Sequence, residues 1–304
     1  MAVLQMQRIS ICALKHDRKA ILEKLQSMGM IEMHQVAQDE AGFEKMDTQS
    51  AKSSFEKRVQ ITENALDVLN QYTPEKKSMF ASLEGNELID KKTMEAAAAK
   101  QEAVMEVAGL LIADHKKIAE AQAEIVKRNT QIEALTPWMS LEVAMNYPGT
   151  KKTVMLLGTM AAETTLEMIY GKLAEDHPEI EAVDISVISQ DKDAVYLSVF
   201  CMKDQAADVE NTLRTAGFSR PVVSTEQIPA KQKEELEEQI RQIEQTIADI
   251  RGEIISYAED REELKIIGDY YRMRAEKYEV LGTLPQSRRT FITVSYTHLT
   301  LPTT

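Results

Sequence analysis

Two stretches with a seven-residue apolar repeat constrain the fold of this chain more than any other feature. In each stretch, apolar residues recur three and four positions apart, which is the spacing of helices that pack side by side along a seam. The first series is Val104, Val107, Leu111, Ile118, Ile125 and Ile132, and the second is Leu236, Ile240, Ile243, Ile247, Ile250 and Ile254. We expect these positions to form the structural seam between an outgoing and a returning helix.

The segment between the two stretches has the pattern of a small α/β lobe. Apolar alternation predicts strands at 153–158, 182–189, 193–201 and 218–223, and helical spacing predicts helices at 164–173 and 203–216. This β-α-β-β-α-β order is that of a ferredoxin-like split βαβ unit. Because the chain enters and leaves the lobe along the two heptad stretches, their helices should be antiparallel.

The two ends of the chain predict a second lobe. Residues 5–14 alternate as a strand, Asp17 is a good N-cap for the helix that follows, and 31–36 reads as another strand. A strand–helix–strand unit of this size cannot bury both faces of its sheet. The strand predicted at 289–294 should therefore pair with the first strand, although almost the whole chain separates them.

These patterns predict an α+β fold in which two small α/β lobes are joined by a long antiparallel two-helix coiled-coil arm. The expected segments are the first part of the proximal lobe (1–47), a helical region with the outgoing arm (48–136), the distal lobe (137–229), the return arm (230–282) and a closing strand of the proximal lobe (283–294). Residues 295–304 carry no Asp, Glu, Lys or Arg and show no pairing pattern. We interpret them as a non-native tail.

The sequence predicts no catalytic, cofactor-binding or metal-binding residues. The segment Gly149–Thr153 lacks the earlier glycine of a phosphate loop. The five histidines are scattered, without HExxH or a cysteine at metal-ligand spacing. Carboxylates on the returning helix are typical of a solvated helix face. We therefore expect a protein that is not an enzyme.

The net charge and the hydropathy of the chain bear on nucleic-acid binding and on membrane insertion. The formal net charge of −13 argues against nucleic-acid binding, which needs clustered Lys and Arg. No apolar run approaches the ~20 residues that cross a bilayer, so the segment as given is expected to be soluble.

Two groups of short motifs stand out: Met1–Ile9, Lys15–Asp17 and Leu25–Glu32 at the start of the chain, and Pro137–Leu141 and Asn146–Thr150 where the outgoing helix meets the distal lobe. The first group resembles the start of subunit I of V/A-type rotary ATPases, the bacterial and archaeal relative of eukaryotic subunit a, and the second is similar to the same family. The resemblance covers nearly all of residues 1–294. After Val294 the family continues with Gly, an aromatic residue and Val-Pro, and this chain departs from that pattern.

The resemblance implies the cytoplasmic stator part of an ion-translocating complex that transports protons or sodium ions and couples this transport to ATP synthesis or hydrolysis. Its lobes would receive peripheral-stalk E and G subunits, and the proximal lobe would lie near the central-stalk adaptor subunit, at the cytoplasmic face of the cell membrane. A membrane (V0) half, outside this chain, would carry the ion path beside the rotor ring. The alternative from a different class is a coiled-coil ligand-sensing or adaptor module with a ferredoxin-like lobe.

Overall fold

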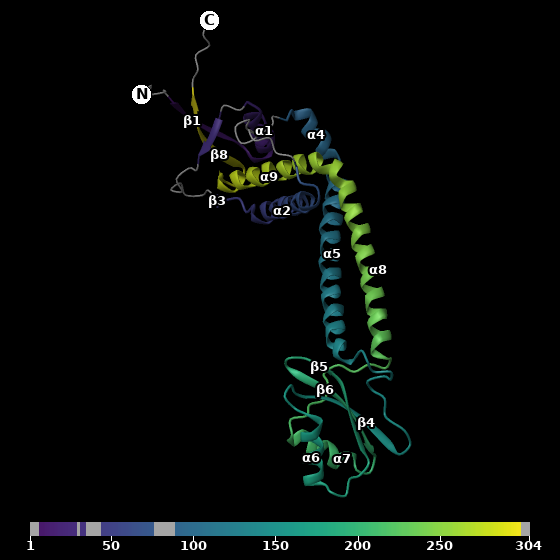
Figure 1. The fold of residues 1–304 in the computed structure, drawn as a ribbon. Coiled ribbons are helices and arrows are strands. Elements are labelled where there is room, and N and C mark those ends of the chain that lie inside the picture. The colour runs from purple at the N-terminus through teal and green to yellow at the C-terminus, as the bar shows by residue number, and fades with distance from the viewer. Residues whose placement is uncertain (1–5, 29–30, 35–43, 76–88, 299–304) are drawn as a thin grey trace, which may run out of the picture. The chain divides into compact units, whose positions relative to one another are not determined.

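The computed structural model describes residues 6–28, 31–34, 44–75 and 89–298. It divides into two compact units: unit 1 is Met1–His115 with Arg251–Thr304, and unit 2 is Lys116–Ile250. The chain passes from unit 1 to unit 2 inside helix α5 (Gln101–Leu135) and returns inside helix α8 (Pro229–Ser256) (Figure 1). Both crossings are therefore helical.

Unit 1 contains an antiparallel sheet made from both ends of the chain. Its strands are β1 (Met6–Leu14), β2 (Ile31–His34), β3 (Glu44–Lys45), β7 (Pro285–Gln286) and β8 (Thr290–His298). The order is β1-β8-β7-β3, and β2 also pairs with β8. Cys12 lies opposite Ile292 in the register of β1 and β8. The predicted pairing of the first and closing strands is confirmed.

The closing strand is longer than expected. It continues beyond residue 294, where Ile9 pairs with Ser295 and Met6 with His298. The closing strand therefore ends at His298 and not at residue 294, whereas the interpretation of 295–304 as a non-native tail stays a prediction. Backbone N–H and C=O groups pair in a ladder whatever side chains they carry, so composition alone did not mark the end of the strand. Residues 299–304 of the expected tail lie outside the described residues.

Helices α1 (Arg18–Met28), α2 (Gln49–Tyr72), α4 (Lys91–Ala99) and α9 (Arg261–Thr283) also lie in unit 1. Leu22 of α1 packs with Leu284 and Phe291, so α1 is attached to the sheet. Helix α2 lies against α9, where a Cβ added at Gly268 would stand 3.0 Å from Thr62 Oγ1. Gly268 therefore permits the close approach of these two helices.

The predicted helices are interrupted twice. Lys100, with φ −96° and ψ 6°, separates α4 from α5. The expected return helix over 230–282 ends at Ser256, and a 3₁₀ turn (Tyr257–Asp260) precedes α9. A 3₁₀ turn has three residues per turn, so it changes the direction in which the following apolar residues point. This change lets α9 bury Leu264, Ile267 and Tyr271 within unit 1.

Unit 2 contains a three-stranded antiparallel sheet of β4 (Thr153–Ala161), β5 (Val183–Gln190) and β6 (Ala194–Met202) in the order β4-β6-β5. Helices α6 (Leu166–Asp176) and α7 (Ala206–Thr215) follow β4 and β6. The fourth strand predicted at 218–223 is reduced to one bridge between Thr159 and Ser219. Pro221 lacks the N–H group that a longer ladder would require. The mixed helix-and-sheet class is confirmed, but the fourth strand is not.

Candidate functional site

The predicted seam positions are withdrawn from solvent along both long helices. The buried ones are Val104, Leu111, Ile118, Leu236, Ile247 and Ile254, and the half-buried ones are Val107, Ile125, Ile132, Ile240, Ile243 and Ile250. The structure brings Ile132 and Leu236 into one apolar cluster at the ends of α5 and α8 that adjoin the lobe of unit 2. Packing of α5 on α8 along the rest of the seam, and hence the coiled-coil arm, stays a prediction.

A polar contact joins the two helices inside unit 2. Arg128 of α5 donates a hydrogen bond from Nε to Gln239 Oε1 of α8, and the N···O distance is 2.9 Å. The same guanidinium forms an ion pair with Glu124 one turn earlier on α5. Gln239 and Leu236 both belong to the first turns of α8, so the two helices meet near this end of the seam.

Trp138 anchors the end of α5 to the sheet of unit 2. The ring is 2 % exposed and meets Tyr196 of β6 edge to face, with 5.3 Å between ring centroids. Ser189 donates a hydrogen bond from Oγ to the carbonyl oxygen of Pro137, at 2.7 Å. These contacts come from two different strands, so the helix end is held in position and orientation.

Arg261 attaches the start of α9 to the end of α2 in unit 1. It is buried at the start of α9, and its guanidinium donates to Leu69 O at 3.3 Å, to Thr73 Oγ1 at 2.7 Å and to Asn70 Oδ1. Glu75 Oε1 lies 3.7 Å from Arg261 NH1. The acceptors lie in and just beyond the last turn of α2, where a cation is favoured by the helix dipole.

Tyr271 joins three helices of unit 1 through its hydroxyl group. Arg58 of α2 donates to Tyr271 Oη at 2.8 Å, and Tyr271 donates to Gln101 Oε1 of α5 at 3.2 Å. The hydrogen bond to Tyr271, and then the negative charge of Glu102, raise the pKa of Arg58 despite partial burial. Arg58 therefore stays charged, and α2, α5 and α9 share one polar contact under a fully buried ring.

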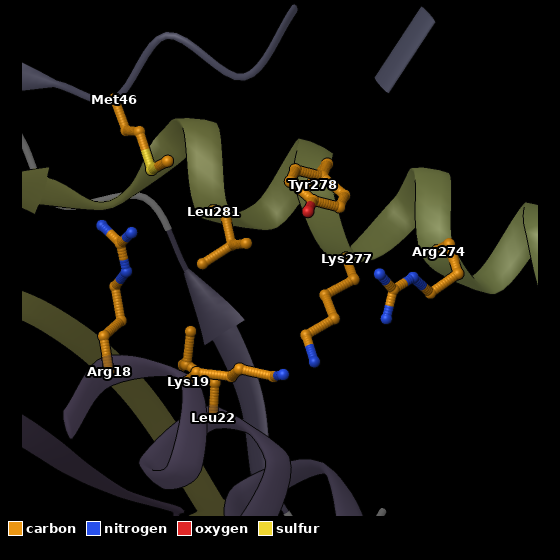
Figure 2. Close-up of a pocket in the computed structure, with 8 residues that line it drawn as sticks. All are labelled: Arg18, Lys19, Leu22, Met46, Arg274, Lys277, Tyr278 and Leu281. Carbon is orange, nitrogen blue, oxygen red and sulfur yellow. The ribbon is translucent and has the colours of Figure 1, made fainter. Parts of the chain in front are cut away.

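A pocket of about 220 Å³ lies between α1 and α9 in unit 1 (Figure 2). Four cationic side chains line the pocket: Arg18, Lys19, Arg274 and Lys277. The other lining side chains are largely apolar: Leu22, Met46, Tyr278 and Leu281. This pocket could not be predicted from the sequence, because its residues come from three segments far apart in the chain. No local pattern links them.

The described part of the chain meets neither the requirements of a metal site nor those of a membrane-spanning helix. Within residues 6–28, 31–34, 44–75 and 89–298, His, Cys, Asp and Glu do not gather in groups of three or more that could hold a metal ion. In the same residues, each helix is too short or too polar to span a membrane.

Comparisons with known proteins give a likeness of fold. No protein-family model and no curated protein matches the chain. A solved structure of the cytoplasmic N-terminal domain of subunit I, homolog of subunit a, of V-ATPase has a similar fold, with a TM-score of 0.50 and 16 % sequence identity. The match covers 94 % of this chain and 92 % of that one. At this identity, the likeness concerns the fold alone.

Proposed function

We propose that this chain is the cytoplasmic stator portion of a subunit-I-like component of a V/A-type rotary ATPase that transports protons or sodium ions. In this role it connects peripheral stalks to the membrane sector and holds the catalytic head against torque. The proposal combines the fold likeness with the motifs at Met1–Ile9 and Pro137–Leu141. It needs no active site in this chain.

The observation that carries the proposal is that two compact units are tied together by two helices instead of loops. Helix α5 has 35 residues and α8 has 28. At ~1.5 Å per residue they are roughly 50 and 40 Å long. A helical backbone is bonded internally, so it transmits force with less bending than a flexible linker does. Such a connection suits a part that must stay still under load.

The attachments at the helix ends support the same role. Trp138 and Pro137 tie the end of α5 to the sheet of unit 2, and Arg261 ties the start of α9 to α2 in unit 1. In unit 1, Tyr271 of α9 also donates a hydrogen bond to Gln101 of α5, so the crossing helix α5 is held at both of its ends. A load on a lobe surface would pass to this helix through these contacts. A ligand sensor does not require this stiffness.

The proposed partners follow from the stator role. Each lobe would bind the end of a peripheral stalk of E and G subunits, and unit 1 would also lie near the central-stalk adaptor subunit. A membrane half outside this chain would place the protein at the cytoplasmic face of the membrane, beside the rotor ring. The chain itself would be a non-catalytic component without a cofactor.

Titration calorimetry of the full chain with purified E–G heterodimer tests the proposal. We expect saturable binding that approaches two heterodimers per chain, one for each lobe. The net charge of −13 predicts weaker binding at high salt, mainly through slower association. A heterodimeric coiled coil of the same length and charge, but unrelated sequence, is the control partner.

The outcomes separate the stator from the adaptor or ligand-sensing alternative. If the chain shows no heat of binding and no co-migration with E–G at any salt concentration, the stator role is ruled out and the alternative is favoured. Equal binding of the control coiled coil would show that the association is only electrostatic. A stoichiometry of one would remove one lobe from the proposed attachment.

A further inference from the structure

The pocket between α1 and α9 concentrates positive charge in an otherwise acidic protein. Figure 2 shows Arg18 and Lys19 reaching from α1, and Arg274 and Lys277 from α9, into the space between the two helices. The chain as a whole has a net charge of −13. Like charges gathered in a small space repel one another, so such a cluster needs counter-charges.

The protein supplies few of those counter-charges. Lys277 Nζ lies 3.2 Å from Glu23 Oε1, and Arg18 donates to the neutral Gln286 Oε1 at 3.0 Å. Across the described ranges of the chain, neither Lys19 nor Arg274 forms an ion pair with a carboxylate. Among the described residues, the four lining cations and Glu23 together carry a charge of +3.

Arg274 also has an unused hydrogen-bond donor. Its Nε is buried and has no hydrogen-bond partner. The guanidinium lies 5.2 Å from the ring centroid of Phe55 and 6.0 Å from that of Tyr278. Stacking on aromatic faces fixes the plane of the guanidinium but supplies no acceptor to its N–H groups. The buried Nε is closed to a ligand, whereas the end of the guanidinium that reaches into the pocket can donate to an oxygen-rich anion (Figure 2).

Glu23 shows that the cations act at one place. Its pKa is lowered by the hydrogen bond from Lys277, then by the charge of Lys277, and further by the charges of Lys19 and Arg274. Lys277 contacts this carboxylate directly, and Lys19 and Arg274 act on it through their charges. An anion at this place would interact with all of them.

The charge and the lining together identify a class of ligand. A carboxylate neutralises one charge, whereas a phosphate monoester carries about −1.5 to −2 at neutral pH. Arginine forks match the geometry of phosphate oxygens. Leu22, Met46 and Leu281 provide an apolar surface beside the cations. We propose that this pocket binds a small-molecule phosphate monoester, with the phosphate between α1 and α9 and its organic part on the apolar side chains.

This inference does not depend on the stator role. Phenyl phosphate is a suitable probe because it joins a monoester to one apolar ring, and benzoate is its control with a similar ring and a single charge. We expect isothermal titration of the full chain to give saturable binding of phenyl phosphate, at least about 10-fold tighter than benzoate. Added salt should weaken the binding.

Variants assign the binding to the pocket. Lys19 is exposed, so Lys19→Gln should leave the fold intact and weaken phenyl phosphate binding by about 3- to 10-fold. Adding Arg18→Gln should weaken it further. Lys57 is an exposed lysine of α2 outside the pocket lining, and Lys57→Gln is the matched control, with unchanged affinity expected. Circular dichroism establishes that each variant keeps its helix content.

Two results would overturn the proposal. One is the absence of saturable phenyl phosphate binding up to about 10 mM. The other is an equal affinity for phenyl phosphate in the original chain, in the Lys19→Gln variant and in the double variant. A separate arm uses vesicles of phosphatidic acid, with phosphatidylcholine vesicles as control. Binding to the acidic vesicles without binding of phenyl phosphate would replace the small molecule by a lipid surface.

Discussion

Replacing Arg261 by methionine tests how unit 1 holds the start of α9. The side chain is 7 % exposed, and its guanidinium donates hydrogen bonds to Leu69, Asn70 and Thr73 at the end of α2. Methionine keeps a flexible stem of comparable length but donates no hydrogen bond. We expect Arg261→Met to destabilise unit 1 and to loosen the attachment of α9 to α2.

The expected cost follows from the groups that lose their partner. Hydrogen bonds that involve a charged group contribute about 1.5–3 kcal/mol to stability. A cation at a helix C-terminus adds about 0.3–1 kcal/mol. Thr73 is half-buried and Glu75 is exposed, so water can replace part of what they lose. We therefore expect a decrease of about 2–4 kcal/mol in the free energy of unfolding of unit 1.

The position of the single tryptophan makes the assay selective. Trp138 is buried in unit 2, so its fluorescence reports that unit, whereas far-UV circular dichroism reports the helices of both. With a urea dependence of about 2 kcal/mol per molar, Arg261→Met should lower the midpoint of the unit 1 transition by about 1–2 M. The fluorescence transition should move much less.

Arg272→Met is the matched control on the same helix. Arg272 is half-exposed and pairs with Glu63 and Asp269 at the surface. Exposed ion pairs contribute less than about 1 kcal/mol, so this variant should unfold nearly like the original chain. If Arg261→Met and Arg272→Met cost the same, or if neither shifts the midpoint, the buried hydrogen bonds of Arg261 do not stabilise unit 1.

Three further predictions concern unit 2. Ile247→Asp places a charge at a buried seam position and should cost about 3–5 kcal/mol, whereas an unchanged fluorescence midpoint in urea would show that the seam is misassigned. Gly158→Ala puts a Cβ 2.1 Å from the ring of Phe218 and should cost about 1–3 kcal/mol by the same measurement, whereas Gly171→Ala, with open space around it, should cost nothing. Ion pairs with two arginines lower the pKa of Glu210 below its usual 4.5, so the stability they add is present above pH 4.5 and is lost as pH falls through the folded-state pKa. Stability curves against pH should therefore be flatter in acid for Glu210→Gln, and curves of equal slope would contradict the assignment.

The local periodicities of the sequence predicted most elements close to where they occur. Alternation in 153–158 and 193–201 corresponds to β4 and β6, and the helical spacing in 164–173 corresponds to α6. Alternation and helical spacing depend on which side chains face the core, so they are visible in the sequence itself. The pairing of β1 with β8 was predictable because the N-terminal unit alone has too few strands.

The ends and interruptions of elements were less predictable. The return helix gives way to a 3₁₀ turn at Tyr257, although the heptad spacing continues to that residue. Its course changes because α9 gains burial against α2, which lies almost two hundred positions earlier in the chain. The strand expected at 218–223 became a single bridge beside Pro221. Local propensity cannot weigh such distant contacts.

The amino-acid pattern by itself determined the two lobes, the long helices and the absence of recognisable catalytic motifs. Only the tertiary structure decided where isolated charges would meet. Arg18 and Arg274 lie more than two hundred residues apart, yet they line one pocket because β1, β8 and α9 bring the two ends of the chain together. Arg261 is equally unremarkable in the sequence until the last turn of α2 lies beside it. Electrostatic sites depend on distances of a few ångströms, and those distances exist only after the chain has folded.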